Sequence, residues 1–176
     1  MHTLIVMCGP MGCGKSTLAK KFAKTHKNTK IISRDKIRFS LISESDEYFK
    51  HEKEVLSLFY QNINDALKEY DYVIADATHL TKSARNQLFR HVNTKNVYVI
   101  GFWVEASERI CIARNSQRSG RSRVPEHVIK EAFNHKVSPA MSERFDCIYF
   151  FNTEQDICIG QTVPTIMSID EILKEI

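Results

Sequence analysis

The stretch that decides the fold is Gly9-Pro10-Met11-Gly12-Cys13-Gly14-Lys15-Ser16-Thr17. It fits the pattern G-x-x-x-x-G-K-[ST], the P-loop that surrounds the phosphates of a nucleoside triphosphate. An apolar run of strand length, residues 3–8, precedes it, and residues 16–23 continue with the apolar spacing of an amphipathic helix. A strand, a glycine loop and a helix in this order form the context that the motif requires.

The residue types in this stretch match the chemistry of phosphate binding. Gly9, Gly12 and Gly14 allow backbone conformations that are closed to side chains, so that successive N–H groups converge on an anion at the positive end of the helix. Lys15 supplies a point charge for the β- and γ-phosphates, and the hydroxyl of Ser16 can ligate Mg²⁺. The sequence therefore predicts that ATP and Mg²⁺ bind here, through Gly9, Gly12, Cys13, Gly14, Lys15, Ser16 and Thr17.

Length and composition predict a single globular domain over residues 1–176. Hydrophobic residues make up 43% of the chain and charged residues 26%, as in soluble proteins. No apolar run reaches the roughly 18 residues of a membrane span, and no signal-peptide pattern precedes the first strand, so we expect a cytoplasmic protein without a membrane partner. The five cysteines show neither a C-x-x-C pair nor histidines at metal spacing, which predicts reduced thiols.

The net charge of +4 conceals two basic zones. Residues 1–38 carry nine lysines and arginines against one acidic residue, Asp35, and residues 114–123 carry four arginines and no acid. Two such zones indicate a polyanionic partner in addition to ATP. For the lysines within residues 20–27, a solvated helix face is an equally good interpretation.

A second candidate site follows the predicted strand at residues 30–33, where Ser33-Arg34-Asp35-Lys36-Ile37-Arg38 opens a helix. Asp35 and Arg38 are three residues apart and share one helix face. Because the carboxyl ends of parallel strands rim the ligand cleft, Asp35 is placed to take a proton from an attacking hydroxyl and Arg38 to hold an anionic acceptor. The alternative interpretation is a helix cap at Asp35 with a local ion pair to Arg38.

The rest of the chain alternates between helical and strand patterns. Further helices are expected over residues 46–70, 106–115 and 126–141, and further strands over 72–76, 96–104 and 145–151. Asp76 ends a buried strand, where we expect a second carboxylate near the water shell of the metal or near the acceptor-side arginine. A histidine in a loop, such as His79, is more often an ordinary polar residue than a catalyst, and we assign it no role. Residues 168–171 form a capping box for a short terminal helix.

Residues 118–125 interrupt the pattern with small, flexible and cationic side chains before the helix that follows Pro125. A mobile loop with arginines suits a lid over about residues 116–125, because arginines there would supply positive charge where the transition state spreads negative charge. The alternative is a basic loop that binds nucleic acid or is merely solvated. The predicted fold is an α/β P-loop NTPase, adenylate-kinase-like, with a parallel five-stranded sheet flanked by helices and an arginine-bearing lid.

Four segments together resemble the kinase domain of the phage-type polynucleotide 5′-hydroxyl kinase family. They are the P-loop, residues 33–38, residues 76–80, and the pattern R-N-x-x-R at residues 114–118 with its following Val124-Pro125. The resemblance implies a stand-alone kinase domain that transfers the γ-phosphate of ATP to the 5′-hydroxyl of DNA or RNA. A nucleic acid 5′ end is therefore the implied partner.

The resemblance also implies roles for individual residues. Lys15 and Ser16 would bind the phosphates and Mg²⁺, Asp35 would be the general base, and Arg38 would hold the acceptor phosphate with support from Asp76. In the lid, the donor phosphates would be clamped by Arg118 together with Arg121 or Arg123. The lid is longer than in the phage pattern, which leaves open whether Arg121 or Arg123 is the arginine finger.

Two other functions fit the same residues. One is a P-loop kinase that acts on a small molecule, such as a nucleoside, a sugar or an antibiotic, for which the basic zones would be incidental. The other is a nucleotide-dependent nucleic-acid-binding ATPase, which would bind DNA or RNA with a steep salt dependence and transfer no phosphate.

Overall fold

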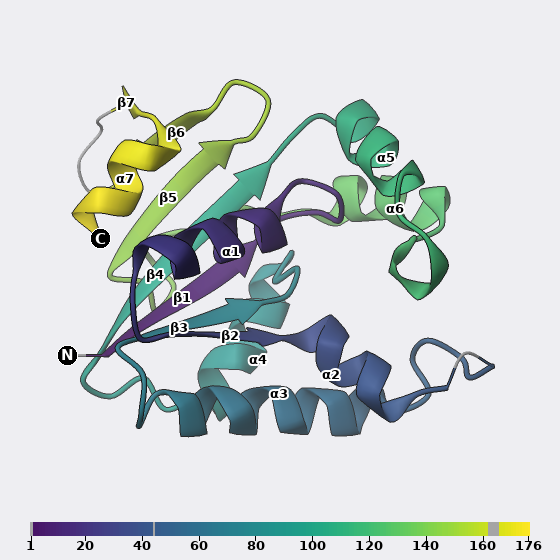
Figure 1. Ribbon diagram of the computed structural model, residues 1–176, viewed down its shortest axis with the longest axis horizontal. Helices are drawn as coiled ribbons and strands as arrows, with labels where there is room; N and C mark the ends of the chain where they lie inside the picture. Colours follow the sequence, from purple (N-terminus) through teal and green to yellow (C-terminus); the bar gives the residue numbers. More distant parts are fainter. Residues whose placement is uncertain (1, 44, 162–165) are drawn as a thin grey trace.

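The computed structural model describes residues 2–43, 45–161 and 166–176 (Figure 1). The strands are β1 (His2–Cys8), β2 (Thr29–Ser33), β3 (Tyr72–Asp76), β4 (Val97–Glu105), β5 (Cys147–Asn152), β6 (Ile157–Gly160) and β7 (Ile166–Met167). The helices are α1 (Lys15–Thr25), α2 (Arg34–Leu41), α3 (Glu52–Ala66), α4 (Lys82–His91), α5 (Glu108–Ser116), α6 (Glu126–His135) and α7 (Ile169–Glu175). A short 3-10 helix, η1 (Gly120–Ser122), lies between α5 and α6.

The strands form one sheet in the order β2-β3-β1-β4-β5-β6-β7. Every neighbouring pair from β2 to β5 is parallel, which confirms the predicted five-stranded parallel sheet and the α/β P-loop fold. The sheet then continues with β6 and β7, which are antiparallel to their neighbours. These two strands were not predicted, because four and two residues are too short to show a periodic pattern.

Helices cover both faces of the sheet (Figure 1). Successive residues of β1 point to opposite faces, so Leu4 and Val6 pack in the core under α3 and α4, while Ile5 and Met7 pack under α1 and α7. Because both faces are buried, the central strands need apolar residues at almost every position. This requirement explains the continuous apolar runs in the sequence.

Two predicted helices are shorter in the structure. The helix expected over residues 46–70 begins at Glu52 and ends at Ala66, and turns occupy the residues before it. The helix expected over residues 126–141 ends at His135. Pro139 explains why the helix does not reach residue 141, since the ring of a proline disfavours helical backbone in the residue before it.

The loop after α6 is held by a buried ion pair. Arg85 of α4 is fully buried, and its Nε and Nη2 atoms donate to the two carboxylate oxygens of Glu143 at 2.8 and 2.9 Å. The same guanidinium donates to the backbone carbonyls of His79, Val137 and Ser138. Arg85 thereby joins α4, the loop after β3 and the loop after α6.

Glu143→Ala is expected to lower the free energy of unfolding by about 3 to 5 kcal/mol, because it leaves the Arg85 guanidinium charged and unpaired inside the protein. Urea denaturation measures the loss. Glu126→Ala is the matched control, since the Glu126–Lys130 pair on α6 has the same charges but is exposed, so that water screens it and its loss is expected to change the stability little. Equal effects of the two substitutions would contradict a structural role for Arg85.

Within residues 2–43, 45–161 and 166–176, we find no helix with both the length and the apolar character needed to span a membrane.

Candidate nucleotide and acceptor site

The P-loop connects β1 to α1 at the carboxyl edge of the sheet (Figure 1). Gly9, Gly12 and Gly14 have positive φ angles of 135°, 82° and 109°. A Cβ atom on Gly9 would lie 2.0 Å from the carbonyl oxygen of Val104, and one on Gly12 would lie 2.4 Å from that of Cys111. The loop therefore requires glycine at these two positions for both backbone angle and space.

Lys15 is the first residue of α1, and its side chain is buried. Its Nζ donates to the carbonyl oxygens of Gly9 at 2.9 Å and Pro10 at 2.6 Å, so the ammonium lies across the loop. Thr17 is exposed, and its backbone N–H donates to the carbonyl of Gly14. An ammonium group with three donors, held at the start of a helix, suits the binding of a phosphate chain.

Ser16 and Asp76 meet at the end of β3. The Ser16 hydroxyl donates to Asp76 Oδ2 at 2.9 Å, which links two residues 60 positions apart. Burial raises the pKa of the Asp76 carboxyl, while the Ser16 hydrogen bond and the Lys15 charge act in the opposite direction. A hydroxyl and a carboxylate beside the phosphate loop are the oxygen ligands that Mg²⁺ prefers when it keeps several waters, so these two residues fit the metal.

Asp35 and Arg38 lie on the first turns of α2, directly after β2. The helix cap is Ser33, whose hydroxyl accepts from the backbone N–H of Lys36, so the capping alternative for Asp35 does not apply. Arg38 Nη1 does donate to Asp35 Oδ1 at 2.6 Å, as the ion-pair alternative expected. The Asp35 side chain is 63% exposed, so its carboxylate remains open to a substrate.

Arg38 is almost completely buried, at 1% exposure. Its Nη2 donates to Glu52 at 2.7 Å, and its Nη1 also donates to the Tyr48 hydroxyl at 2.9 Å. Burial would lower the pKa of the guanidinium, but the hydrogen bond to Glu52 and the nearby negative charges hold this pKa above its usual value. Arg38 is thus paired with Glu52, whereas Asp76, which we expected to support it, is hydrogen-bonded to Ser16.

Tyr48 and Glu52 were missed by the sequence analysis, which assigned both to a structural helix. Tyr48 bonds to both Arg38 and Asp35, since its hydroxyl accepts from Arg38 and donates to Asp35 Oδ1 at 3.0 Å. Burial is also the main reason why the pKa of Tyr48 rises to about 12, so this hydroxyl stays protonated at neutral pH. The sequence contained no signal for either residue, because the contacts depend on how α3 and the turns before it pack against α2.

Arg34 is a further residue that the predictions left out. Its Nε is buried and, like the Nε of Arg38, has no hydrogen-bond partner in the part of the chain that the structure describes. The charge of Arg34 acts on Tyr60, which lies on α3, and on His79, which lies in the loop after β3. Arg34 is therefore a cation at the carboxyl end of β2 that is suited to an anionic ligand.

The predicted lid contacts the C-terminal end of α2 and the residue that follows it. Arg121 Nη1 donates to the carbonyl of Ile42 at 2.7 Å, and its guanidinium lies 5.0 Å from the ring centre of Phe39. Arg118 and Arg123 are exposed. The structure thus places Arg121 against the C-terminal end of α2 and leaves the other two predicted lid arginines open to solvent.

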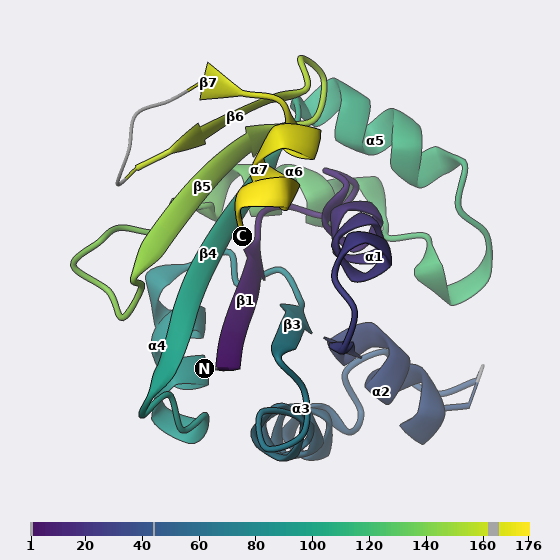
Figure 2. The same ribbon diagram turned by 60° about the vertical axis from the view of Figure 1, so that its left-hand side comes forward.

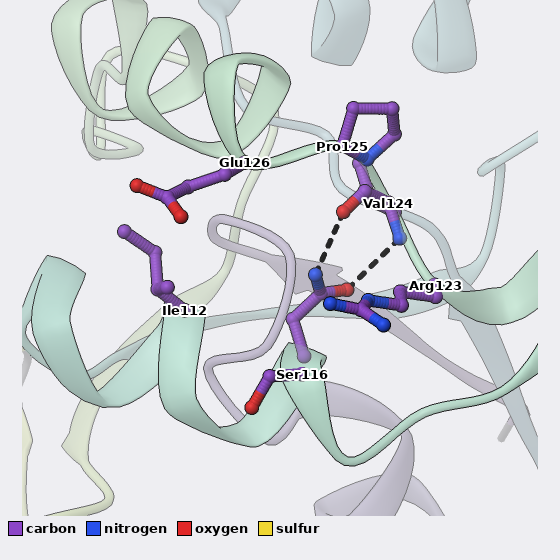
Figure 3. A pocket seen from close by; sticks show the side chains of 7 residues that line it. Ile112, Ser116, Arg123, Val124, Pro125 and Glu126 are labelled. Carbon is purple, nitrogen blue, oxygen red and sulfur yellow. Dashed lines mark hydrogen bonds between the residues drawn. The ribbon is translucent and has the colours of Figure 1, made fainter.

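A partly open pocket of about 300 Å³ lies at the base of the predicted lid, between α5 and α6 (Figure 3). Asn115 is buried there and forms two hydrogen bonds with the backbone of Val124, at 2.7 and 3.0 Å. Arg123 also lines this pocket. The paired hydrogen bonds fix where the lid ends and α6 begins.

Arg114 and Thr153 form the side of the P-loop that faces β5. Arg114 Nη1 donates to the Thr153 hydroxyl at 2.8 Å and to the carbonyl of Cys13 at 3.3 Å, and the Thr153 hydroxyl donates to the same carbonyl at 3.0 Å. The Cys13 side chain itself is buried. Arg114 belongs to one of the basic zones of the sequence, and in the structure its hydrogen bonds join it to the phosphate loop.

His79 is buried and does not behave as an ordinary polar loop residue. Its Nδ1 lies 2.8 Å from the carbonyl oxygen of Met7, which can only accept, so Nδ1 carries the hydrogen. Burial lowers the pKa of the imidazole to about 3, and the charges of Arg34, Lys15 and Arg85 act in the same direction. His79 is therefore neutral at physiological pH and anchors the loop after β3 to β1.

The free energy of unfolding is expected to fall as the pH drops from about 6.5 towards 3, because the unfolded chain binds a proton at His79 in this range and the folded chain does not. The contribution of this group is about 1.4 kcal/mol for each pH unit. His79→Asn tolerates the positive φ of 37° and removes the titration. Denaturation at a series of pH values should show a shallower slope for the variant, and an unchanged slope would contradict a neutral buried His79.

The fold and the site define a P-loop nucleotide-binding protein of the α/β class, and a P-loop of this build implies ATP binding. Residues 4–138 match the model of the AAA domain family, and the chain belongs to this family. The sequence matches none of the curated proteins with which it was compared.

Several solved structures have a similar fold. Kti12 from Chaetomium thermophilum in complex with ADP-AlF3 is 15% identical, with a TM-score of 0.67 over 98% of this chain and 96% of that chain. An unliganded sugar kinase from Janibacter sp. HTCC2649 is 10% identical, with a TM-score of 0.65 over 99% and 92%. A fungal RNA kinase is 18% identical, with a TM-score of 0.58 over 85% and 73%. At these identities the likeness shows the shared fold.

Proposed function

We propose that the protein is an ATP-dependent kinase that transfers the γ-phosphate of ATP to the 5′-hydroxyl of a DNA or RNA strand. Asp35 carries this proposal, because a buried arginine orients its exposed carboxylate. The charge of Asp35 also acts on Asp76, which is hydrogen-bonded to the P-loop serine. An exposed, oriented carboxylate close to the phosphate loop is what a general base for phosphoryl transfer requires.

In the proposed reaction, the 5′-hydroxyl oxygen attacks the γ-phosphorus, its proton passes to Asp35, and the bond from this phosphorus to the ADP oxygen breaks. Arg38 and Tyr48 hold the Asp35 carboxylate in position through their hydrogen bonds. Lys15 and the P-loop N–H groups bind the β- and γ-phosphates. Mg²⁺, when bound at Ser16, would neutralise part of the phosphate charge.

The lid completes the donor side of the proposed site. Arg121 is engaged by the Ile42 carbonyl and the Phe39 ring, whereas Arg123 is exposed. We therefore assign the arginine finger to Arg123, with Arg118 as the second arginine that binds the donor phosphates. Positive charge from an arginine over the γ-phosphate stabilises the charge that spreads there in the transition state.

Arg34 favours an anionic acceptor over a neutral one. The Asp35 carboxylate could serve any hydroxyl, but the buried, unpartnered Nε of Arg34 calls for a hydrogen-bond acceptor. A polynucleotide offers a phosphodiester next to its terminal hydroxyl, and a guanidinium binds phosphate oxygens well. A neutral sugar or nucleoside would leave Arg34 unused.

Label from γ-labelled ATP is expected to move to a 5′-hydroxyl oligonucleotide in the presence of Mg²⁺, and not to the same oligonucleotide with a 5′-phosphate. Asp35→Asn should lower kcat by about a hundredfold or more, because the attacking hydroxyl loses its base, while the Kd for ATP stays nearly unchanged. Initial rates and nucleotide titration measure the two quantities.

A panel of nucleosides and sugars tests the alternative acceptor class in the same assay. Label on one of these small molecules, with none on the oligonucleotide, would overturn the polynucleotide acceptor and keep the kinase fold. Full activity of the Asp35→Asn variant would remove Asp35 as the base. Nucleic acid binding without any transfer would favour the ATPase alternative.

Arg34→Gln is expected to raise the KM for the oligonucleotide about tenfold and to leave the KM for ATP unchanged, because one acceptor phosphate loses its cation. The plot of log kcat/KM against log salt should become shallower by about 0.7 for a single strand. Lys36→Gln on the same helix is the control, since Lys36 is exposed. An equal effect of the two substitutions would mean that Arg34 contributes general charge and no specific contact.

A further inference from the structure

Phe49 is the most exposed large hydrophobic side chain in the part of the chain that the structure describes, at 67% exposure. It lies in the segment between α2 and α3, which projects from the sheet on the same side as the lid (Figures 1 and 2). Exposure of a phenylalanine ring to water costs free energy, and exposed apolar surface often marks a binding site. Because Phe49 lies close to Arg38, which pairs with Asp35, we expect a ligand of this site to cover the ring.

The ring is supported on one side and open on the other. Tyr48 packs edge to face against Phe49, with ring centres 4.9 Å apart and planes at 84°. The Arg38 guanidinium lies 5.6 Å from the Phe49 ring centre and 4.4 Å from that of Tyr48. Tyr48 is itself fixed by its hydrogen bonds with Asp35 and Arg38, so Phe49 rests on the group that holds the candidate base.

The aromatic row continues towards the lid. Tyr48 contacts Phe39, with ring centres 6.2 Å apart and planes at 73°, and Arg121 of the lid lies over Phe39. Phe49 therefore stands at one end of the row, Tyr48 next to it contacts the candidate base, and the cationic loop lies at the other end. A ligand that covers Phe49 would lie close to the Arg38 guanidinium and to the group of side chains that holds Asp35.

We propose that Phe49, supported by Tyr48, is the stacking platform for the nucleobase of the 5′-terminal nucleotide of the acceptor strand. This inference rests on the proposed function and specifies how the acceptor is recognised. Any base can stack on an aromatic ring, since every base has a π-face, so the platform selects a nucleotide without selecting its sequence. The terminal base is joined through a single sugar to the hydroxyl that Asp35 would deprotonate.

A cycle of substrate and enzyme variants tests the platform. Two 5′-hydroxyl oligonucleotides are compared, one with a normal terminal nucleotide and one with an abasic terminal nucleotide, on the wild-type protein and on Phe49→Ala. The wild type should prefer the base-containing strand by about tenfold in kcat/KM, because stacking of one base on an aromatic ring has an effect of that order. Phe49→Ala should lose this preference, and Phe49→Trp should restore it.

Tyr98→Ala is the matched control, because Tyr98 is another exposed aromatic residue and lies near the start of β4, at the edge of the sheet opposite the P-loop. It should retain the full preference for the base. As a second readout, a 2-aminopurine at the 5′ end should lose fluorescence on binding to the wild type, and less on binding to Phe49→Ala.

The outcomes separate the platform from the proposed function. Transfer to both strands at equal rates, or a preference that survives in Phe49→Ala, would overturn the platform and leave the kinase assignment intact. Absence of transfer to both strands by the wild-type protein would overturn the proposed function, and the platform with it. A loss of preference in Tyr98→Ala as well would show a general effect of removing aromatic surface and contradict the assignment to Phe49.

Discussion

The site depends on a glycine loop that is enclosed by other parts of the backbone. Side chains at Gly9 and Gly12 would collide with carbonyl oxygens of β4 and α5, so the loop can adopt its shape in this fold only as glycine. The same contacts mean that the phosphate-binding N–H groups are positioned by the strands and helix around them. Lys15, at the end of this loop, is buried, and its ammonium donates to the Gly9 carbonyl in the same loop. The shape of the phosphate loop therefore depends on the strands and helices packed around it as well as on its own sequence.

The parallel order of β2, β3 and β1 brings the remaining chemistry to that edge. The backbone N–H of Gly9 donates to the carbonyl of Thr78, and Ser16 is bonded to Asp76, so the loop after β3 is fastened to the P-loop at two points. Because α2 begins directly after β2, Asp35 lies at the same edge. The buried guanidinium of Arg38, which is paired with Glu52, holds the Asp35 carboxylate in place and leaves it exposed to solvent.

The sequence was most informative where the chemistry is local. The P-loop, the parallel strands and the capping box, in which Ser168 and Glu171 bond as predicted, are all encoded within a few residues. Contacts between distant residues were out of reach: Arg38 and Glu52 are 14 positions apart, and their meeting depends on how α3 packs on α2. The short hairpin strand β6 and the burial of His79 likewise follow from tertiary packing, for which no residue pattern gives a signal.

A crystal structure of the protein with Mg²⁺, a non-hydrolysable ATP analogue and a 5′-hydroxyl trinucleotide would test most directly whether one cleft joins donor and acceptor. We expect the 5′-oxygen within hydrogen-bond distance of the Asp35 carboxylate and in line with the γ-phosphate, which the P-loop would hold beside Lys15. A trinucleotide bound away from Asp35, with the analogue still seated in the P-loop, would contradict the account and show that this edge of the sheet serves a different acceptor.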